Sequence, residues 1–380
     1  MSRGPISQGW ERLAAATKAF ATPGPRMVDE LECVASVLLA ILFGHLAGAR
    51  NISWAAFSGY MVMRGHVSET LWRGLLRIAG TGLGAGVAIW LTPLIRTSPA
   101  LSGTALALVG GVSLYGMLTR KHAYAWLFVG LTFEMILLDQ LEHPAEPLLA
   151  FAATRAREVS AGTIACVLVS LLSTWSLRRR WPARPQPPAQ RLGWNRGAAR
   201  HAGQAALALA VLPFIGHAWR VPELAQAAVT IMAVMIVPVT SIGAGGIAPV
   251  RRRILLRLAG GISGAALAAA FLLLAHSPGL SAAAGPVLIA GTLLGTAIGR
   301  HIENGQGALA YGGTQFVLVI LTALVPDSYA SADLHPGLAR LVGIAVGTVL
   351  LLPVLLAWQV AAPARRAKAV EEGPAESGGI

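Results

Sequence analysis

Charged side chains are scarce in this sequence. Asp, Glu, Lys and Arg make up 12% of its 380 residues, about half the share found in soluble domains. Acidic residues are the rarer sign, with 17 Asp and Glu against 30 Lys and Arg. The basic residues lie in short clusters between apolar blocks and form no long stripe with interleaved aromatic residues. We therefore exclude an ordinary soluble domain and expect no nucleic-acid partner.

Cysteine and the familiar catalytic motifs are also lacking. The two cysteines, Cys33 and Cys166, fall within apolar stretches, which excludes a disulfide framework and a cysteine metal site. The sequence contains no Gly-x-x-x-x-Gly-Lys-Ser/Thr loop, no His-Glu-x-x-His pair and no Gly-x-Ser-x-Gly elbow. We therefore predict that the protein is not an enzyme and holds neither a cofactor nor a metal ion.

Apolar residues are abundant and fall in long blocks. Hydrophobic residues make up 55% of the chain and the mean hydropathy is +0.62. Many blocks approach the roughly 20 residues that span a bilayer, and an isolated spanning segment must be helical to satisfy its backbone. The sequence predicts an all-α polytopic membrane protein with twelve transmembrane helices, near residues 28–47, 52–63, 77–95, 101–118, 123–138, 148–175, 201–217, 224–242, 257–275, 283–299, 308–325 and 337–359.

The distribution of basic residues predicts the topology. With the N-terminus in the cytoplasm, most of the Lys and Arg fall in cytoplasmic segments, including Arg73 and Arg77 before the third block. Acids such as Asp139 and Glu142 gather in the outward loops. We expect a multi-pass protein of the bacterial inner membrane with both termini in the cytoplasm.

The two halves of the sequence repeat each other. RIAGTGLGAGVA at 77–88 aligns with RLAGGISGAALA at 257–268, and we also match Thr132 with Thr314 and Arg155 with Arg340. An even number of helices in each half makes this a parallel repeat, with a pathway expected at the interface of the halves. The predicted organisation is a cytoplasmic N-terminal segment (1–27), a first six-helix repeat (28–177), a basic proline-rich cytoplasmic linker (178–200), a second six-helix repeat (201–360) and a disordered cytoplasmic tail (361–380).

Five stretches carry a resemblance to a known family: WAAFSGYMVMR at 54–64, RGLLRIAGTGLGA at 73–85, AYAWLFVGLTF at 123–133, RAREVSAGT at 155–163 and ARLVGIAVGT at 339–348. They resemble the fusaric acid resistance family, within the aromatic acid exporter superfamily. The resemblance covers most of 28–360, but the long soluble domains of larger members are absent. It implies proton-driven efflux of aromatic carboxylic acids across the bacterial inner membrane.

Glycines spaced four apart recur in both halves. Such pairs place small residues on one helix face, so that neighbouring helices can approach closely. A direct role in lining a pore is the alternative. The candidate packing glycines are Gly80, Gly84, Gly260, Gly264, Gly343 and Gly347.

Arginines within the sixth and twelfth blocks are the candidate substrate-binding residues. Charges inside a bilayer are costly and usually mark a pathway or an ion pair. A guanidinium group matches the geometry of a carboxylate, so Arg155, Arg157 and Arg340 are predicted to bind the anionic substrate. The structural alternative is a pair between Arg155 and Glu158, three residues apart, or arginines that reach the outer headgroups.

Two further groups are candidates for proton chemistry. Glu134 lies alone in an apolar helix, where a protonated carboxyl is tolerable and an ionised one expensive. Glu134 and Glu158 are therefore predicted to couple transport to protons, although Glu134 could instead be a packed polar residue. His45 and His217 end helices on the outer side in equivalent positions, where they could form a pH-sensing gate or simply make interfacial hydrogen bonds.

Together these features favour a secondary exporter of small aromatic organic acids, driven by proton antiport. A passive organic-anion channel and an accessory membrane subunit without transport activity are the alternatives. The expected partners are membrane lipids, the organic-acid substrate and protons, and a homo-oligomer or a periplasmic adaptor protein remains open.

Overall fold

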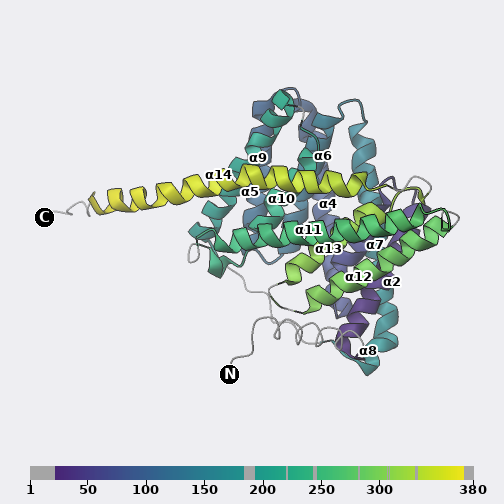
Figure 1. The fold of residues 1–380 in the computed structure, drawn as a ribbon. Coiled ribbons are helices and arrows are strands. Elements are labelled where there is room, and N and C mark those ends of the chain that lie inside the picture. The colour runs from purple at the N-terminus through teal and green to yellow at the C-terminus, as the bar shows by residue number, and fades with distance from the viewer. Residues whose placement is uncertain are drawn as a thin grey trace, which may run out of the picture. The chain divides into compact units, whose positions relative to one another are not determined.

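The computed structural model describes residues 22–183, 193–219, 221–242, 246–280, 283–305, 307, 309–329 and 333–371. Each of the twelve predicted apolar blocks corresponds to a helix in this part of the chain (Figure 1). They are α2 (Pro25–Leu46), α3 (Ile52–Val62), α4 (Val67–Ile95), α5 (Pro99–Thr119), α6 (Ala123–Glu142), α7 (Leu148–Trp175), α9 (Arg196–Trp219), α10 (Leu224–Met235), α11 (Ala248–Ala275), α12 (Ala284–Asn304), α13 (Ala310–Leu324) and α14 (His335–Glu371). A short helix, α8 (Leu177–Arg180), follows α7.

Seven of these helices are long and apolar enough to cross a membrane: α4, α5, α6, α7, α9, α11 and α14. Helices α2 and α12, of 22 and 21 residues, are not among the seven. Helices α3, α10 and α13 have only 11, 12 and 15 residues. The all-helical class is therefore established for the described residues, whereas twelve spans and cytoplasmic termini stay predictions.

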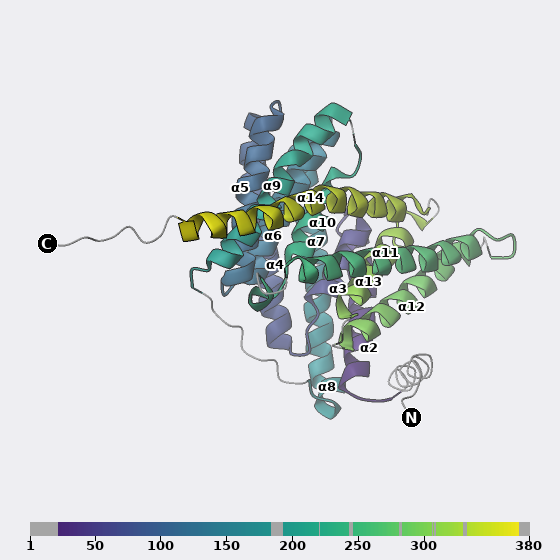
Figure 2. The same ribbon diagram turned by 60° about the vertical axis from the view of Figure 1, so that its left-hand side comes forward.

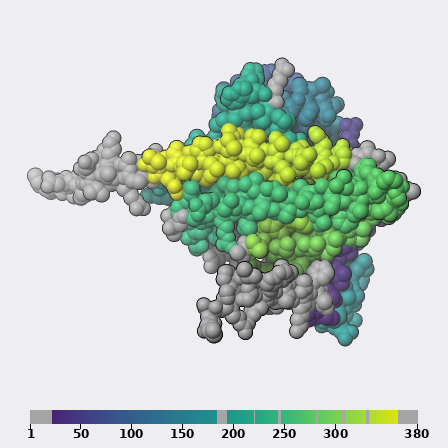
Figure 3. Space-filling view, viewed as in Figure 1, coloured from purple at the N-terminus to yellow at the C-terminus, as the bar shows by residue number. Residues whose placement is uncertain are grey.

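Exposed apolar side chains support a membrane setting. In the space-filling view of Figure 3, α11 lies at the visible surface. Its outward-facing residues include Leu255, Ile262, Leu273 and Leu274, which are 48–74% exposed. Large apolar surface of this kind is costly in water and is compatible with lipid.

Two helices begin earlier than the apolar blocks indicate. The sequence places the third and ninth helices at 77 and 257, but α4 begins at Val67 and α11 at Ala248. The basic residues before each block belong to the helix rather than to a loop. Arginine is a good helix former, so charge marks the end of an apolar block without ending the helix.

The chain forms two compact units, and each takes segments from both halves of the sequence. Unit 1 comprises Met1–Gly82, Leu149–Ala189 and Leu255–Leu341, and unit 2 comprises Leu83–Leu148, Gln190–Ile254 and Val342–Ile380. In unit 1, α2 packs on α3 and α12, and α13 packs on α12 and α3 (Figure 2). In unit 2, α9 packs on α5 and α10, and α6 packs on α5 and α10.

An ion-pair network joins the start of α2 to the end of α12 in unit 1. Asp29 Oδ2 lies 2.7 Å from Arg300 Nε, and Glu30 Oε1 lies 2.8 Å from His301 Nδ1. The buried Tyr60 hydroxyl donates to Glu303 Oε2 at 2.6 Å. Arg178, the first residue of the predicted cytoplasmic linker, is buried in this network and paired to Glu32 at 2.5 Å, and Arg300 is buried in it too.

Equivalent glycine contacts occur within each half of the sequence. A Cβ atom on Gly162 of α7 would lie within 3 Å of the Ala55 carbonyl oxygen and the Ser58 Cβ of α3. A Cβ atom on Gly347 of α14 would lie within 3 Å of the Ala227 carbonyl oxygen and the Thr230 Cβ of α10. Both glycines therefore allow a long helix to approach the backbone of a short one, as the repeat in sequence leads us to expect.

The same comparison corrects one part of the sequence alignment. Gly84 packs against Val129 and Thr132 of α6, and its repeat mate Gly264 packs against Phe316 and Val319 of α13. Thr132 is therefore equivalent to Val319, and the match of Thr132 with Thr314 is wrong. The alignment fails because short apolar helices offer few distinctive residues to fix their register.

Candidate functional site

The short helix α3 lies buried in unit 1 and is capped by two acidic side chains. Glu158 Oε1 accepts a hydrogen bond from Asn51 N at 3.1 Å, and Asp327 Oδ1 accepts one from Ile52 N at 2.9 Å. Carboxylates at a helix N-terminus satisfy the backbone N–H groups that lack a helical partner and complement the helix dipole. At 11 residues, α3 is about 16 Å long, roughly half the thickness of the hydrocarbon core.

Arg155 reaches α3 from α7. Its Nη1 lies 3.1 Å from Glu158 Oε2, so the predicted ion pair forms, and both residues are buried. Its guanidinium carbon lies 4.5 Å from the ring centre of Trp54 and 4.9 Å from that of Phe151. Arg155 is therefore held by one carboxylate and two aromatic faces, an arrangement that offsets part of the cost of burying the charge.

Arg77 approaches the same helix from α4. It is 1% exposed, and its Nη2 donates to Ser58 Oγ at 2.9 Å. Its guanidinium carbon lies 5.1 Å from the ring centre of Phe57. The Phe57 ring in turn meets the Trp54 ring edge-on, with centroids 5.4 Å apart.

These contacts connect two buried cations through neighbouring aromatic rings. We call Trp54, Phe57, Arg77, Phe151 and Arg155 the arginine–aromatic cluster. Arginines bind carboxylates through two parallel hydrogen bonds, and aromatic rings stack on flat apolar groups. The cluster thus combines the two kinds of contact that an aromatic carboxylate would require.

Sequence reasoning missed Arg77, which it treated as a cytoplasmic anchor. The sequence held a signal, because Arg257 occupies the place equivalent to Arg77 in the repeat. The structure shows that Arg257 is buried as well, with 1% of its surface exposed. Arg257 Nη1 donates to Gln315 Oε1 at 2.6 Å. The preceding arginines are equivalent too, since Arg73 donates to the Met61 carbonyl and Arg253 donates to the Ala233 carbonyl.

The three predicted anion-binding arginines have different surroundings. Arg155 belongs to the cluster. Arg340 is 4% exposed and lies close to Arg257 and Tyr311. Arg157 is exposed and lines a groove on the surface of unit 1.

Glu134 is fully buried in unit 2. A Cβ atom on Gly110 of α5 would lie 2.7 Å from its Oε1, so the carboxyl group is pressed against the neighbouring backbone. Neither carboxyl oxygen has a hydrogen-bond partner among the described residues. An ionised carboxylate in this position would be costly, so this packing suits the protonated form.

The remaining predicted residues lie at helix ends and in helix contacts. His45 near the end of α2 and His217 near the end of α9 are both exposed. Gly260 and Gly264 pack against α13, and Gly343 packs against Gln226. Gly80 is buried. Within the described residues, no group of three or more His, Cys, Asp or Glu side chains is placed to hold a metal ion.

Comparison with known proteins gives one match. Residues 31–186 match the fusaric acid resistance protein family. The match confirms the resemblance over these residues, which contain every residue of the arginine–aromatic cluster, whereas the resemblance of the second half stays a prediction. The family is one of transporters, and together with the seven helices long and apolar enough to cross a membrane the match indicates a membrane protein. No match to the chain was found among curated proteins or among solved structures.

Proposed function

We propose that this protein exports small aromatic organic acids across the bacterial inner membrane and that proton antiport drives the export. The observation that carries the proposal is the arginine–aromatic cluster. Its two buried cations suit a carboxylate, and its rings suit an aromatic body. The match to a transporter family supports the same reading.

In the proposed binding mode, the substrate carboxylate replaces Glu158 at Arg155 while the ring packs against Trp54 and Phe57. Arg77 supplies a second cation over the ring of Phe57. Because Arg155 is already paired with Glu158, the substrate must compete with that carboxylate. Ionised Glu158 therefore weakens substrate binding, and protonated Glu158 releases Arg155.

The competition between the substrate and Glu158 for Arg155 decides how this pair can couple transport to protons. Protonation of Glu158 and anion binding at Arg155 favour each other, and such a linkage is reciprocal. Acting alone, it would move a proton and an anion in the same direction. Antiport therefore requires another proton site, and we assign that role to Glu134. Its carboxyl oxygens have no hydrogen-bond partner among the described residues, so protonation breaks no hydrogen bond there.

A passive anion channel is the second candidate. The cluster suits it equally well, because conduction needs cations along the path and no proton-carrying group. The two candidates differ in their dependence on Glu134.

The test is reconstitution of purified protein into vesicles with an imposed pH gradient, using a panel of labelled aromatic acids. An antiporter accumulates substrate against its gradient, and Glu134→Gln abolishes the accumulation while leaving substrate exchange at equal pH. The exposed Glu146→Gln is the matched control. A channel instead conducts equally in the wild type and in Glu134→Gln. If no organic anion moves under any gradient, both candidates are wrong.

A further inference from the structure

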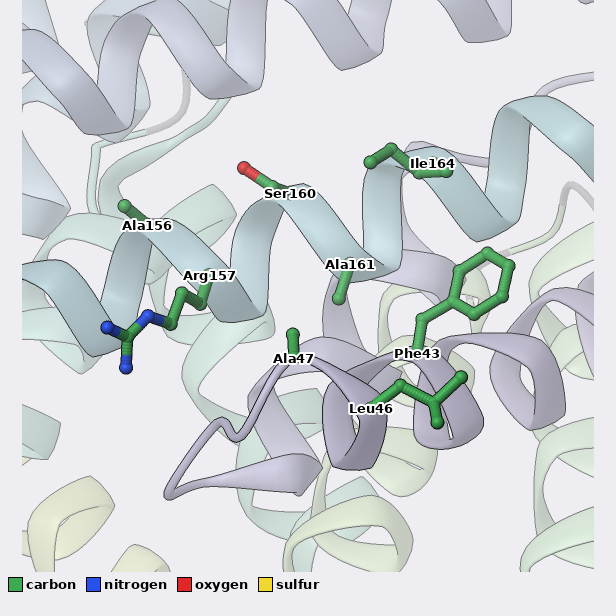
Figure 4. A pocket seen from close by; sticks show the side chains of 8 residues that line it. All are labelled: Phe43, Leu46, Ala47, Ala156, Arg157, Ser160, Ala161 and Ile164. Carbon is green, nitrogen blue, oxygen red and sulfur yellow. The ribbon is translucent and has the colours of Figure 1, made fainter.

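A groove on the surface of unit 1 lies between the end of α2 and the first half of α7. It has a volume of about 500 Å³. Most of its lining is apolar, with one cation and one hydroxyl group. The lining residues are Phe43, Leu46, Ala47, Ala156, Arg157, Ser160, Ala161 and Ile164 (Figure 4).

Arg157 is separated from the arginine–aromatic cluster although it follows Arg155 by two residues. Residues two apart on a helix do not face the same side, so Arg155 is buried and Arg157 is exposed. Within the described part of the chain, no hydrogen bond or ion pair is found for the Arg157 side chain. A cation on an apolar, membrane-facing surface is costly unless an anion or water reaches it.

The charged and apolar residues of the groove lie at different positions along the axis of α7. Arg157 follows the first residue of α7 by nine positions, about 14 Å, and Ile164 lies about 10 Å deeper. In Figure 4 the guanidinium group extends towards the start of α7, whereas Phe43 and Ile164 line the opposite end. The groove is therefore charged at the end nearer the start of α7 and apolar at the other end. With the start of α7 at the membrane surface, as the sequence predicts for this span, the charged end is the shallower one.

We propose that this groove binds one anionic phospholipid. Its phosphate is held by Arg157, and one acyl chain runs along Phe43, Leu46 and Ile164. A phospholipid has the same order of charge and apolar surface as the groove, whereas a small aromatic acid has no long apolar part to fill the deeper end. Leu46 and Ile164 are 75% and 51% exposed, so the apolar wall is open to the acyl layer.

The second half of the chain offers an internal comparison. The residue equivalent to Arg157 is Val342, which is 45% exposed. The cation is thus not a general requirement of the repeat. The site depends on the first half alone and does not rest on the proposed transport activity.

The test is native mass spectrometry of the purified protein in detergent with equal amounts of phosphatidylglycerol and phosphatidylcholine. The wild type should retain phosphatidylglycerol in preference to phosphatidylcholine. Arg157→Ala should lower this preference about fivefold, the effect of one surface cation near an anionic headgroup. Arg96→Ala removes another exposed arginine outside the groove and should leave the preference unchanged.

A second variant tests the apolar end separately. Ile164→Asn keeps the cation but makes the apolar end polar, so it should lower retention of phosphatidylglycerol although the charge is unchanged. The proposal is overturned if the wild type shows no preference, if Arg157→Ala retains it, or if Arg96→Ala loses it to the same extent. Displacement of the lipid by millimolar benzoate would assign the groove to small carboxylates and would equally overturn it.

Discussion

At the scale of single residues, Arg77 and Arg155 differ in what holds them. Arg155 is neutralised by Glu158 at 3.1 Å, whereas the contacts of Arg77 include the neutral Ser58 hydroxyl and the face of Phe57. Both guanidinium groups lie against aromatic rings of α3, so each is placed to attract an anion that reaches those rings. We therefore expect Arg77 as well as Arg155 to contribute to substrate affinity.

Arg77→Ala should lower kcat/KM for aromatic acid transport by about tenfold or more, the effect of losing a hydrogen bond to a charged group. Arg77→Lys should retain part of the activity, because it keeps the charge but not the planar fork. Transport kinetics in vesicles measure both effects. Ser58→Ala, which removes a neutral partner of Arg77 and leaves the cation, is the control. Equal rates in all four proteins would exclude Arg77 from the pathway.

Glu158 should act in the opposite direction. Because its carboxylate occupies Arg155, Glu158→Gln should lower the KM for the anion severalfold. The same reasoning gives a pH dependence for the wild type, in which KM falls as acidification protonates Glu158. The variant should lose that dependence, and measuring KM across pH in both proteins tests the linkage. A higher KM in Glu158→Gln would show that Glu158 supports binding rather than competing with it.

At the scale of helices, the short elements α3 and α10 are held in the same way. Asp327 caps the N-terminus of α3, and Glu142 caps that of α10, accepting from Leu224 N at 2.7 Å. Each short helix also receives a close approach from a long one at a glycine, Gly162 or Gly347. Short helices have little stability of their own, so these contacts fix their positions.

Adding a single methyl group at either glycine tests this packing. Gly162→Ala and Gly347→Ala should each cost about 1–3 kcal/mol, because the new Cβ would meet a backbone carbonyl within 3 Å. Gly82→Ala is the matched control, since no atom lies within 4 Å of its Cβ position and alanine favours a helix. Thermal unfolding in detergent should show lower midpoints for the first two variants alone. An unchanged midpoint would mean that the helices can separate at no cost.

Helix positions could be predicted from the sequence, whereas the burial of charges could not. Apolar blocks located all twelve helices because lipid or a protein core must cover them. Arg77 was misread because its burial depends on Ser58 and Phe57, which belong to another helix. The pair of Arg155 with Glu158 was foreseen as an alternative because it lies within one helix turn. Contacts across helices need the tertiary structure.

At the scale of the whole molecule, neither compact unit can be built from one half of the sequence. Unit 1 combines Met1–Gly82 and Leu149–Ala189 with Leu255–Leu341, and unit 2 is the reciprocal combination. The predicted repeat boundaries therefore do not coincide with the compact units, because each unit combines helices from both halves of the sequence. In unit 1, α2 from the first half contacts α12 from the second, and in unit 2, α9 from the second half contacts α5 from the first.

Cutting the chain between Ala189 and Gln190 tests this combination of helices from both halves. Fragments 1–189 and 190–380 should each aggregate when expressed alone, because each lacks the partners of half its helices. Expressed together, they should assemble and co-purify at the size of the intact protein in fluorescence-detected size-exclusion chromatography. A second cut between Leu148 and Leu149, where the chain also passes from one unit to the other, serves as a comparison and should likewise yield fragments that depend on each other. If the 1–189 fragment runs alone as a stable monodisperse species, each half folds by itself and the combination of helices from both halves is wrong.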